Sequence, residues 1–268
     1  NKESPMQRLV PNHIQIETIN GRCTSRCIMC NYKHWTRKPR VMSNEEFFTI
    51  MRKFLPHKDQ IDFFTFHGDG EPLLDRDLPE KVAFAKQHGF KGLGLATNCT
   101  ELNEEMSLGL LEAGMDTIIC SIDGTDAETH EAIRKGTHFD SIVAQVKRFI
   151  KLRNERFRGS TRILIRFIRQ QLNYGQWDDF YAYWHTLVSP ELGDDVIRFD
   201  VHNCAGGVDE YEDKQCDDTP IDGYVCNYIF DRLIIFSDGS VCFCPPDPNG
   251  FFKLGNVLQE DPIDIFNN

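Results

Sequence analysis

Apolar residues recur along this chain in two patterns that alternate up to about residue 200. Short apolar, β-branched runs indicate buried strands, and each is followed by a stretch with the spacing of an amphipathic helix. The predicted strands are residues 14–19, 61–66, 92–97, 117–122, 162–168 and 196–201. The predicted helices are residues 44–55, 78–88, 104–112, 126–134, 140–156 and 176–187. Six successive units predict an α/β protein with a parallel sheet, either curved into a barrel or open and doubly wound.

Polar or glycine-rich segments follow five of these strands. A cysteine-rich segment, 23–30, follows the first strand, and the sequence HGDGEP, at 67–72, follows the second. Segments 97–98, 121–124 and 202–204 follow the third, fourth and sixth strands. Ligands of parallel α/β folds bind at the carboxyl ends of the strands, so we expect a site at this rim.

The first of these segments holds three cysteines, Cys23, Cys27 and Cys30, in the spacing C-x3-C-x2-C. Three thiolates on one loop can bind three irons of a 4Fe–4S cluster and leave the fourth iron open to a substrate. Ferredoxin sites use four cysteines, and structural zinc sites prefer paired C-x2-C knuckles with four ligands. The spacing therefore favours an open cluster, with zinc binding or uninvolved thiols as the alternatives.

Composition narrows the possible partners and the compartment. The net charge of −11 argues against nucleic acid as a partner, because phosphate binding needs clustered lysine and arginine. The sequence contains no apolar run long enough to span a bilayer and no leader pattern, so we expect no membrane segment or signal peptide. Ten cysteines without an export signal fit metal binding in a reducing compartment, and we expect a cytoplasmic protein.

The cysteine spacing, together with the sequence GDGEP at 68–72, resembles the radical S-adenosylmethionine (SAM) superfamily over about residues 10–205. This resemblance implies a partial (β/α)6 TIM-like barrel. It also implies a 4Fe–4S cluster on the three cysteines and SAM bound to the open iron through its amine and carboxylate. In that family, an electron from the cluster cleaves SAM to a 5′-deoxyadenosyl radical, which removes a hydrogen atom from an unactivated C–H bond. An external flavodoxin- or ferredoxin-like protein is the expected electron donor.

The resemblance also implies which rim residues bind SAM. They are Gly68, Gly70, Glu71, Asn98, Ser121, Asp123 and Arg134. The two glycines would let the backbone approach the amino-acid end of SAM, unless they only form a strand-to-helix turn. Their carbonyls or Glu71 would accept from its ammonium group, and Ser121 and Asp123 would bind the ribose or the carboxylate. Arg134 would pair with the carboxylate, or it is a surface arginine near a helix end.

Two positions depart from the family pattern. Met29 stands where an aromatic residue is common, and its adaptable apolar side chain can still pack against adenine. Cys99 stands where the family commonly has glycine, after Thr97 and Asn98. Because cysteine lacks the freedom of glycine at positive φ, the family pattern does not determine the shape of this loop.

The C-terminal segment carries a second cysteine pattern. Cys226 is followed by Gly239 and then Cys244, which resembles the start of the SPASM and twitch extensions of radical SAM enzymes. Residues 229–243 predict a β-hairpin around a Ser-Asp-Gly turn. The resemblance implies that residues 206–268 hold an auxiliary Fe–S cluster that uses Cys226 and Cys244, and it calls for further cysteines downstream, which this sequence lacks. Either the sequence is truncated, or Cys216 and Cys242 complete a single cluster locally, and we favour the local cluster. A zinc knuckle on the same four cysteines is the alternative.

The reaction outcome and the substrate stay open from the sequence. Cys204 follows the sixth strand at the predicted rim, where a thiol could return a hydrogen atom to a substrate radical, as epimerisation requires. An auxiliary cluster favours dehydrogenation, and a buried uninvolved thiol is the alternative for Cys204. We expect a polar small molecule, such as a sugar or aminocyclitol, with a ribosomally made peptide as the second candidate. A non-enzymatic Fe–S or zinc module would explain the cysteines but not the other rim segments.

Overall fold

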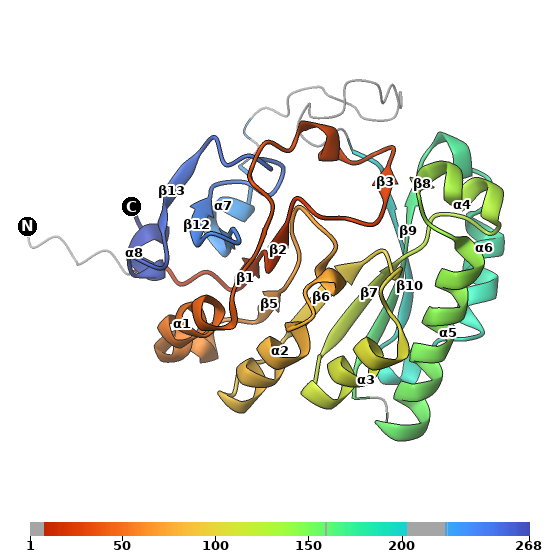
Figure 1. The fold of residues 1–268 in the computed structure, drawn as a ribbon, viewed down its shortest axis with the longest axis horizontal. Helices are drawn as coiled ribbons and strands as arrows, with labels where there is room; N and C mark the ends of the chain where they lie inside the picture. Colours follow the sequence, from red (N-terminus) through yellow and green to blue (C-terminus); the bar gives the residue numbers. More distant parts are fainter. Residues whose placement is uncertain (1–7, 159, 203–222, 224) are drawn as a thin grey trace, which may run out of the picture.

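The structure is a computed structural model that describes residues 8–158, 160–202, 223 and 225–268. Its centre is a nine-stranded sheet of order β10-β9-β7-β6-β5-β1-β11-β12-β13. The six predicted strands are parallel neighbours in this sheet. They are β1 (His13–Ile16), β5 (Phe63–Thr65), β6 (Leu93–Thr97), β7 (Thr117–Ser121), β9 (Arg162–Arg169) and β10 (Asp195–Asp200). The predicted fold class is therefore confirmed as an α/β fold with a partial TIM-like barrel (Figure 1).

The predicted helices are all present, within two residues of their expected ends. They are α1 (Asn44–Phe54), α2 (Leu78–Gln87), α3 (Glu104–Ala113), α4 (Ala127–Ile133), α5 (Phe139–Arg156) and α6 (Trp177–His185). Short 3₁₀ segments are η1 (Asn31–His34), η2 (Leu55–Gln60), η3 (Pro72–Leu74), η4 (Gln171–Asn173) and η5 (Pro190–Leu192). Figure 1 shows the helices along the outer side of the curved sheet. No helix in the described ranges is long and apolar enough to cross a membrane.

The apolar core lies between the sheet and these helices. In β9, Ile163, Ile165 and Phe167 are fully buried in this core. Because side chains alternate across a strand, Arg166 between them points to the opposite, concave side. A sheet of this kind is thus apolar toward the helices, and its other face is free to carry polar groups. Those groups form the interior of the partial barrel.

Four short strands hold the cysteine-rich segment over the rim, and only one of them, β2, overlaps a predicted strand. They are β2 (Ile19–Asn20), β3 (Arg26–Cys27), β4 (Arg40–Val41) and β8 (Arg134–Lys135). β2 pairs with β4, and β3 pairs with β8, both antiparallel. The predicted first strand, 14–19, therefore splits into β1 and β2, because the chain leaves the main sheet at Glu17 to begin the cysteine loop.

The C-terminal hairpin joins the main sheet and does not form a separate layer. β11 (Arg232–Ile235) pairs parallel with β1 and antiparallel with β12 (Ser240–Cys242), which pairs with β13 (Lys253–Asn256). The chain ends with α8 (Pro262–Phe266). The prediction of a strand from residue 229 was wrong, because Tyr228–Asp231 form the short helix α7. The division into domains at residues 10–205 and 206–268 stays a prediction.

Candidate active site: a three-cysteine pocket at the carboxyl rim

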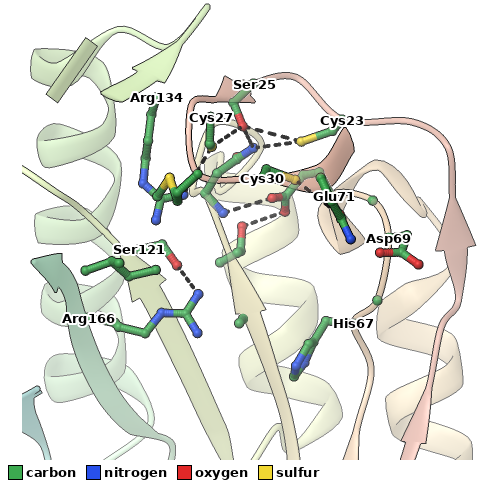
Figure 2. A pocket seen from close by; sticks show the side chains of 18 of the residues that line it. Cys23, Ser25, Cys27, Cys30, His67, Asp69, Glu71, Ser121, Arg134 and Arg166 are labelled. Atoms are coloured by element: carbon green, nitrogen blue, oxygen red, sulfur yellow. Dashed lines mark hydrogen bonds between the residues drawn. The ribbon is translucent and has the colours of Figure 1, made fainter. Parts of the chain in front are cut away.

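The carboxyl ends of the parallel strands surround a pocket of about 620 Å³, a size typical of small-molecule sites. All three cysteines of the first loop line it. Six of the seven predicted SAM-binding residues also line it: Gly68, Gly70, Glu71, Asn98, Ser121 and Arg134. Figure 2 shows the cysteines at one end of the pocket, with Arg166 and His67 farther into the barrel. The fold thus brings together segments that lie more than a hundred residues apart in the sequence.

The cysteine loop is placed by backbone pairing with the segment after α4. In this pairing Cys27 lies opposite Arg134, and the Ile28 N–H donates to the Ile133 carbonyl at 2.9 Å. The Arg134 guanidinium therefore reaches Cys27 Sγ, at 3.6 Å from Nη1. No sequence pattern predicts this pairing, because both strands have only two residues.

Polar side chains lie near all three thiols, with Asn31 Oδ1 4.0 Å from Cys30 Sγ and closer contacts at the other two. Ser25 Oγ is 3.4 Å from both Cys23 Sγ and Cys27 Sγ. The Asn98 amide nitrogen is 3.6 Å from Cys23 Sγ and also donates to Thr24 and Ser25. N–H and guanidinium donors beside sulfur stabilise thiolates and the sulfur ligands of Fe–S clusters.

Burial disfavours ionisation of these thiols while no cation is near them. It raises the pKa of Cys23, and it raises the pKa of Cys30 to about 12. Thiolates at these positions therefore need a bound cation, as metal ligands do. In the described part of the chain, no three His, Cys, Asp or Glu side chains converge as a site for a single ion. The three thiols line one pocket, as a cluster with three protein ligands requires.

Gly68 and Gly70 are required by close backbone packing against the segment after β1. A Cβ on Gly68 would lie 2.8 Å from the Glu17 side chain, and a Cβ on Gly70 would lie 2.8 Å from the Ile19 carbonyl oxygen. The structure thus gives a reason for both glycines that differs from the predicted approach to SAM. Their contact with SAM stays a prediction.

Glu71 is buried and largely satisfied by protein donors. Its Oε1 accepts from Thr97 Oγ1 at 2.6 Å and from the Leu73 N–H at 3.1 Å, and its Oε2 accepts from the Asn98 N–H at 2.8 Å. Burial raises the pKa of Glu71 to about 7, although these hydrogen bonds oppose the shift. One lone pair on Oε2 has no protein donor in these contacts, so the predicted bond from an ammonium group is still possible.

In the loop after β6, Cys99 adopts the positive φ that glycine favours, so the premise that cysteine cannot take this conformation was wrong. Cys99 adopts a φ of 64°, in the left-handed region, and is fully buried. Its N–H donates to Thr97 Oγ1 at 2.9 Å, which helps to hold the strained residue in place. A non-glycine residue in this region costs about 1–2 kcal/mol.

Asp123 does not line the pocket and instead positions Arg134. Its Oδ2 accepts from Arg134 Nε at 2.7 Å, and its Oδ1 accepts from the Ile168 N–H at 2.7 Å. Both side chains are buried, so the reading of Arg134 as a surface arginine was wrong. Ser121 faces the pocket, where its Oγ accepts from Arg166 Nη2 at 2.7 Å. Met29 lines the same pocket, as expected for an apolar wall.

Three of the predicted auxiliary-cluster cysteines lie in the described residues. Cys226 is exposed, Cys244 is half-buried and Cys242 is buried. The Cys242 thiol donates to the Cys244 carbonyl at 3.3 Å, and burial raises its pKa to about 12. Burial, Cys226 and Asp247 together raise the pKa of Cys244. Cys204 and Cys216 lie outside the described residues.

Arg37 is an organising residue that sequence reasoning missed. Its guanidinium donates to both oxygens of Glu17, to Asp69 Oδ2 at 3.1 Å and to the Pro248 carbonyl. It also lies 3.7 Å above the Phe236 ring. Arg37 therefore ties the cysteine loop to β1, to the loop after β5 and to the C-terminal segment. The only sequence signal for it was the acidic Glu17 at an otherwise apolar strand end.

A three-thiol loop at the carboxyl rim of a partial α/β barrel defines a class of Fe–S enzymes in which one iron can take a non-protein ligand. Comparison with protein families identifies this class, because the model of the Radical SAM superfamily matches residues 18–166. The chain therefore belongs to the radical SAM superfamily. This family implies a 4Fe–4S cluster and SAM, which the three cysteines and the pocket above fit.

The sequence identity to individual curated relatives is low. A tungsten-containing aldehyde ferredoxin oxidoreductase cofactor-modifying protein of Pyrococcus furiosus is 28% identical over 173 residues, which are 63% of this chain and 47% of that protein. The chain thus matches about half the length of this curated relative.

Solved structures share the fold. The structure of BtrN in complex with AdoMet and 2-DOIA has a TM-score of 0.63 at 18% identity, over 98% of this chain and 84% of that one. The structure of Streptococcus suis SuiB bound to precursor peptide SuiA has a TM-score of 0.73 at 15% identity, over 96% of this chain and 65% of that one.

Proposed function

We propose that this protein reductively cleaves SAM and abstracts a hydrogen atom from a polar biosynthetic substrate. Family membership and the pocket support the proposal. The observation that carries it is that three thiols line a pocket together with polar side chains deeper in the barrel. When bound, the cluster and SAM supply one-electron chemistry that removes a hydrogen atom from an unactivated C–H bond.

The residues of the chain would hold and orient these groups. Cys23, Cys27 and Cys30 would bind the cluster, with Asn98 and Arg134 donating toward the sulfurs. Asp123 fixes the guanidinium of Arg134 from behind, so that its remaining N–H groups face the pocket. The glycine turn and Glu71 form the wall that would face the amino-acid end of SAM.

The test is anaerobic reconstitution with iron and sulfide, followed by addition of SAM and a reductant. We expect 5′-deoxyadenosine to form, and we expect Cys27→Ala to abolish it together with about four irons per chain. Cys120→Ala is a matched control, because this buried thiol lies in the apolar core and not in the pocket. If reconstituted, reduced protein leaves SAM intact, the proposed enzymatic activity is refuted and a non-enzymatic Fe–S or zinc module is the alternative.

We further propose an auxiliary Fe–S cluster of the SPASM or twitch type on Cys226 and Cys244, with Cys216 and Cys242 as partners. The hairpin β11–β12 and the adjacent Asp247, whose buried Oδ1 has no hydrogen-bond partner, support a cationic centre there. Iron and zinc counts on Cys244→Ala test it: the variant should lose about four irons and retain 5′-deoxyadenosine formation. Loss of zinc instead would favour a zinc knuckle.

Two outcomes follow hydrogen abstraction, and they differ in what becomes of the substrate radical. Dehydrogenation releases a further electron and a proton, and an auxiliary cluster would supply the electron acceptor. Epimerisation needs a returned hydrogen atom, for which Cys204 is the candidate donor. With any substrate that stimulates 5′-deoxyadenosine formation, reaction in deuterated water separates them. Solvent deuterium in the product that is lost in Cys204→Ala indicates epimerisation, and an oxidised product indicates dehydrogenation.

For the substrate, we propose a polar small molecule such as a sugar or aminocyclitol. A peptide is the second candidate, supported by the likeness of the fold to SuiB, which was solved with a precursor peptide. An external flavodoxin- or ferredoxin-like donor would supply the electron, and the cytoplasm is the proposed location.

A further inference from the structure

The interior of the barrel, beyond the cysteine loop, carries two arginines and a histidine. Arg166 points from β9 into the pocket, where Figure 2 shows it beside Ser121 and across from His67. Arg232, at the start of β11, lies over the ring of the pocket residue Tyr228, 4.2 Å from its centroid. His67 lies close enough to both guanidinium groups for their charges to contribute to lowering its pKa.

Neither guanidinium is neutralised by a carboxylate in the ranges that the structure describes. The hydrogen-bond partner of Arg166 is the Ser121 hydroxyl, and that of Arg232 is the Gln15 amide oxygen at 3.4 Å. The Nε atoms of both arginines are buried without a partner, and so is His67 Nδ1. Three unpartnered nitrogens therefore lie around one part of the barrel interior.

The described carboxylates around the pocket make their contacts elsewhere, and Asp200, which also lines it, pairs with Arg169. Asp123 pairs with Arg134. Glu17 and Asp69 pair with Arg37. Glu71 accepts from three protein donors, as described above. The two guanidinium groups therefore form a small positively charged region, although the net charge of the chain is −11.

An unpaired buried cation is costly, because its hydration is lost and not replaced. Burial and the nearby Arg134 lower the pKa of Arg166 to about 10, so it stays charged at neutral pH. His67, whose pKa burial lowers to about 3, stays neutral and can donate one N–H. Two guanidinium groups with a neutral imidazole donor form a suitable site for an oxyanion.

We propose that the substrate carries a carboxylate or phosphate group that binds Arg166 and His67, with Arg232 adding positive charge. This inference rests on the proposed function and narrows its substrate class: a sugar or cyclitol that presents a carboxylate or phosphate to this part of the pocket is favoured over one that presents an amino group there. We expect the carboxylate of SAM at Arg134, which contacts the Cys27 thiol, so that Arg166 adjoins the SAM site only through Ser121.

The experiment is calorimetric titration of reconstituted, SAM-saturated protein with inorganic phosphate and, separately, with acetate. We expect binding of at least one anion, which identifies phosphate or carboxylate as the preferred group. Arg166→Gln should weaken it about tenfold or more, as expected for loss of charge-assisted hydrogen bonds. Arg166→Lys should retain most of the affinity. Arg162→Gln is the matched control, because it removes the same charge from the exposed start of the same strand.

Two results would overturn the inference. One is equal anion affinity for wild type and Arg166→Gln, with the fold checked by circular dichroism and the cluster by iron content. The other is loss of SAM binding by Arg166→Gln when no phosphate or acetate is added, which would make Arg166 a cofactor residue. Neither result depends on SAM cleavage. Failure to form 5′-deoxyadenosine would therefore refute the proposed function, whereas the two results above would refute only the anion site.

Discussion

Replacing Arg37 with methionine should destabilise the protein far more than the same change at a surface arginine. The guanidinium of Arg37 faces Glu17, whose side chain is 2% exposed, with Nη1 to Oε1 at 2.8 Å. The side chain of Arg37 is itself only 11% exposed. Arg37→Met would keep most of the length of the side chain but leave the buried Glu17 carboxylate with backbone donors alone, from Asp69 and Ser237, and no cationic partner.

The size of the effect follows from this uncompensated charge. Removing one partner of a buried ion pair costs about 3–5 kcal/mol. Loss of the contact with the Phe236 ring adds about 1 kcal/mol, although the two terms are not additive. Arg40 offers a matched control, because it makes a two-pronged ion pair with Glu46 at 2.7 and 2.8 Å. Those side chains are 36% and 27% exposed, so Arg40→Met should cost only about 0–1 kcal/mol.

Urea unfolding followed by circular dichroism measures both variants against wild type. The double variant Glu17→Gln/Arg37→Met should recover part of the loss, because no unpaired carboxylate is left at position 17. The reasoning is refuted if Arg37→Met costs no more than Arg40→Met. It is also refuted if the double variant is less stable than Arg37→Met, since charge burial would then not be the cause.

Two further predictions concern single buried residues. Because burial raises the pKa of Glu71 from its ordinary 4.5 to about 7, the folded protein binds this proton more tightly than the unfolded chain. The stability gained from this tighter proton binding is complete below about pH 4.5 and is lost as the pH rises to about 7. The free energy of unfolding of wild type should therefore fall by about 3 kcal/mol relative to that of Glu71→Gln across this window. Urea unfolding at several pH values checks this, and parallel pH profiles would contradict it. At Cys99, whose φ is 64°, Cys99→Gly should be more stable than Cys99→Ala by about 1 kcal/mol, although glycine is smaller. Thermal unfolding compares the two, and a more stable alanine variant would show that the backbone is not strained there.

The elements of the barrel and the cysteine loop were predictable from the sequence. Each strand and helix is encoded by a local period of apolar residues, so its position along the chain needs no knowledge of its neighbours. The spacing of Cys23, Cys27 and Cys30 is likewise local. Helix ends also follow local signals, as in the capping box between Ser43 and Glu46 and the left-handed Gly114 after α3.

Contacts between segments distant in the chain could not be predicted in this way. The sequence determined that three thiols and several polar loops would gather at one rim, because parallel strands place their carboxyl ends on the same side. Only the tertiary structure decided that Asp123 holds Arg134, that Arg37 joins the cysteine loop to the C-terminal segment, and that β11 extends the sheet beside β1. These contacts depend on how pairs of segments approach each other in space. A buried charge needs a partner, but which residue provides it is decided by the packing of distant segments and not by the local sequence.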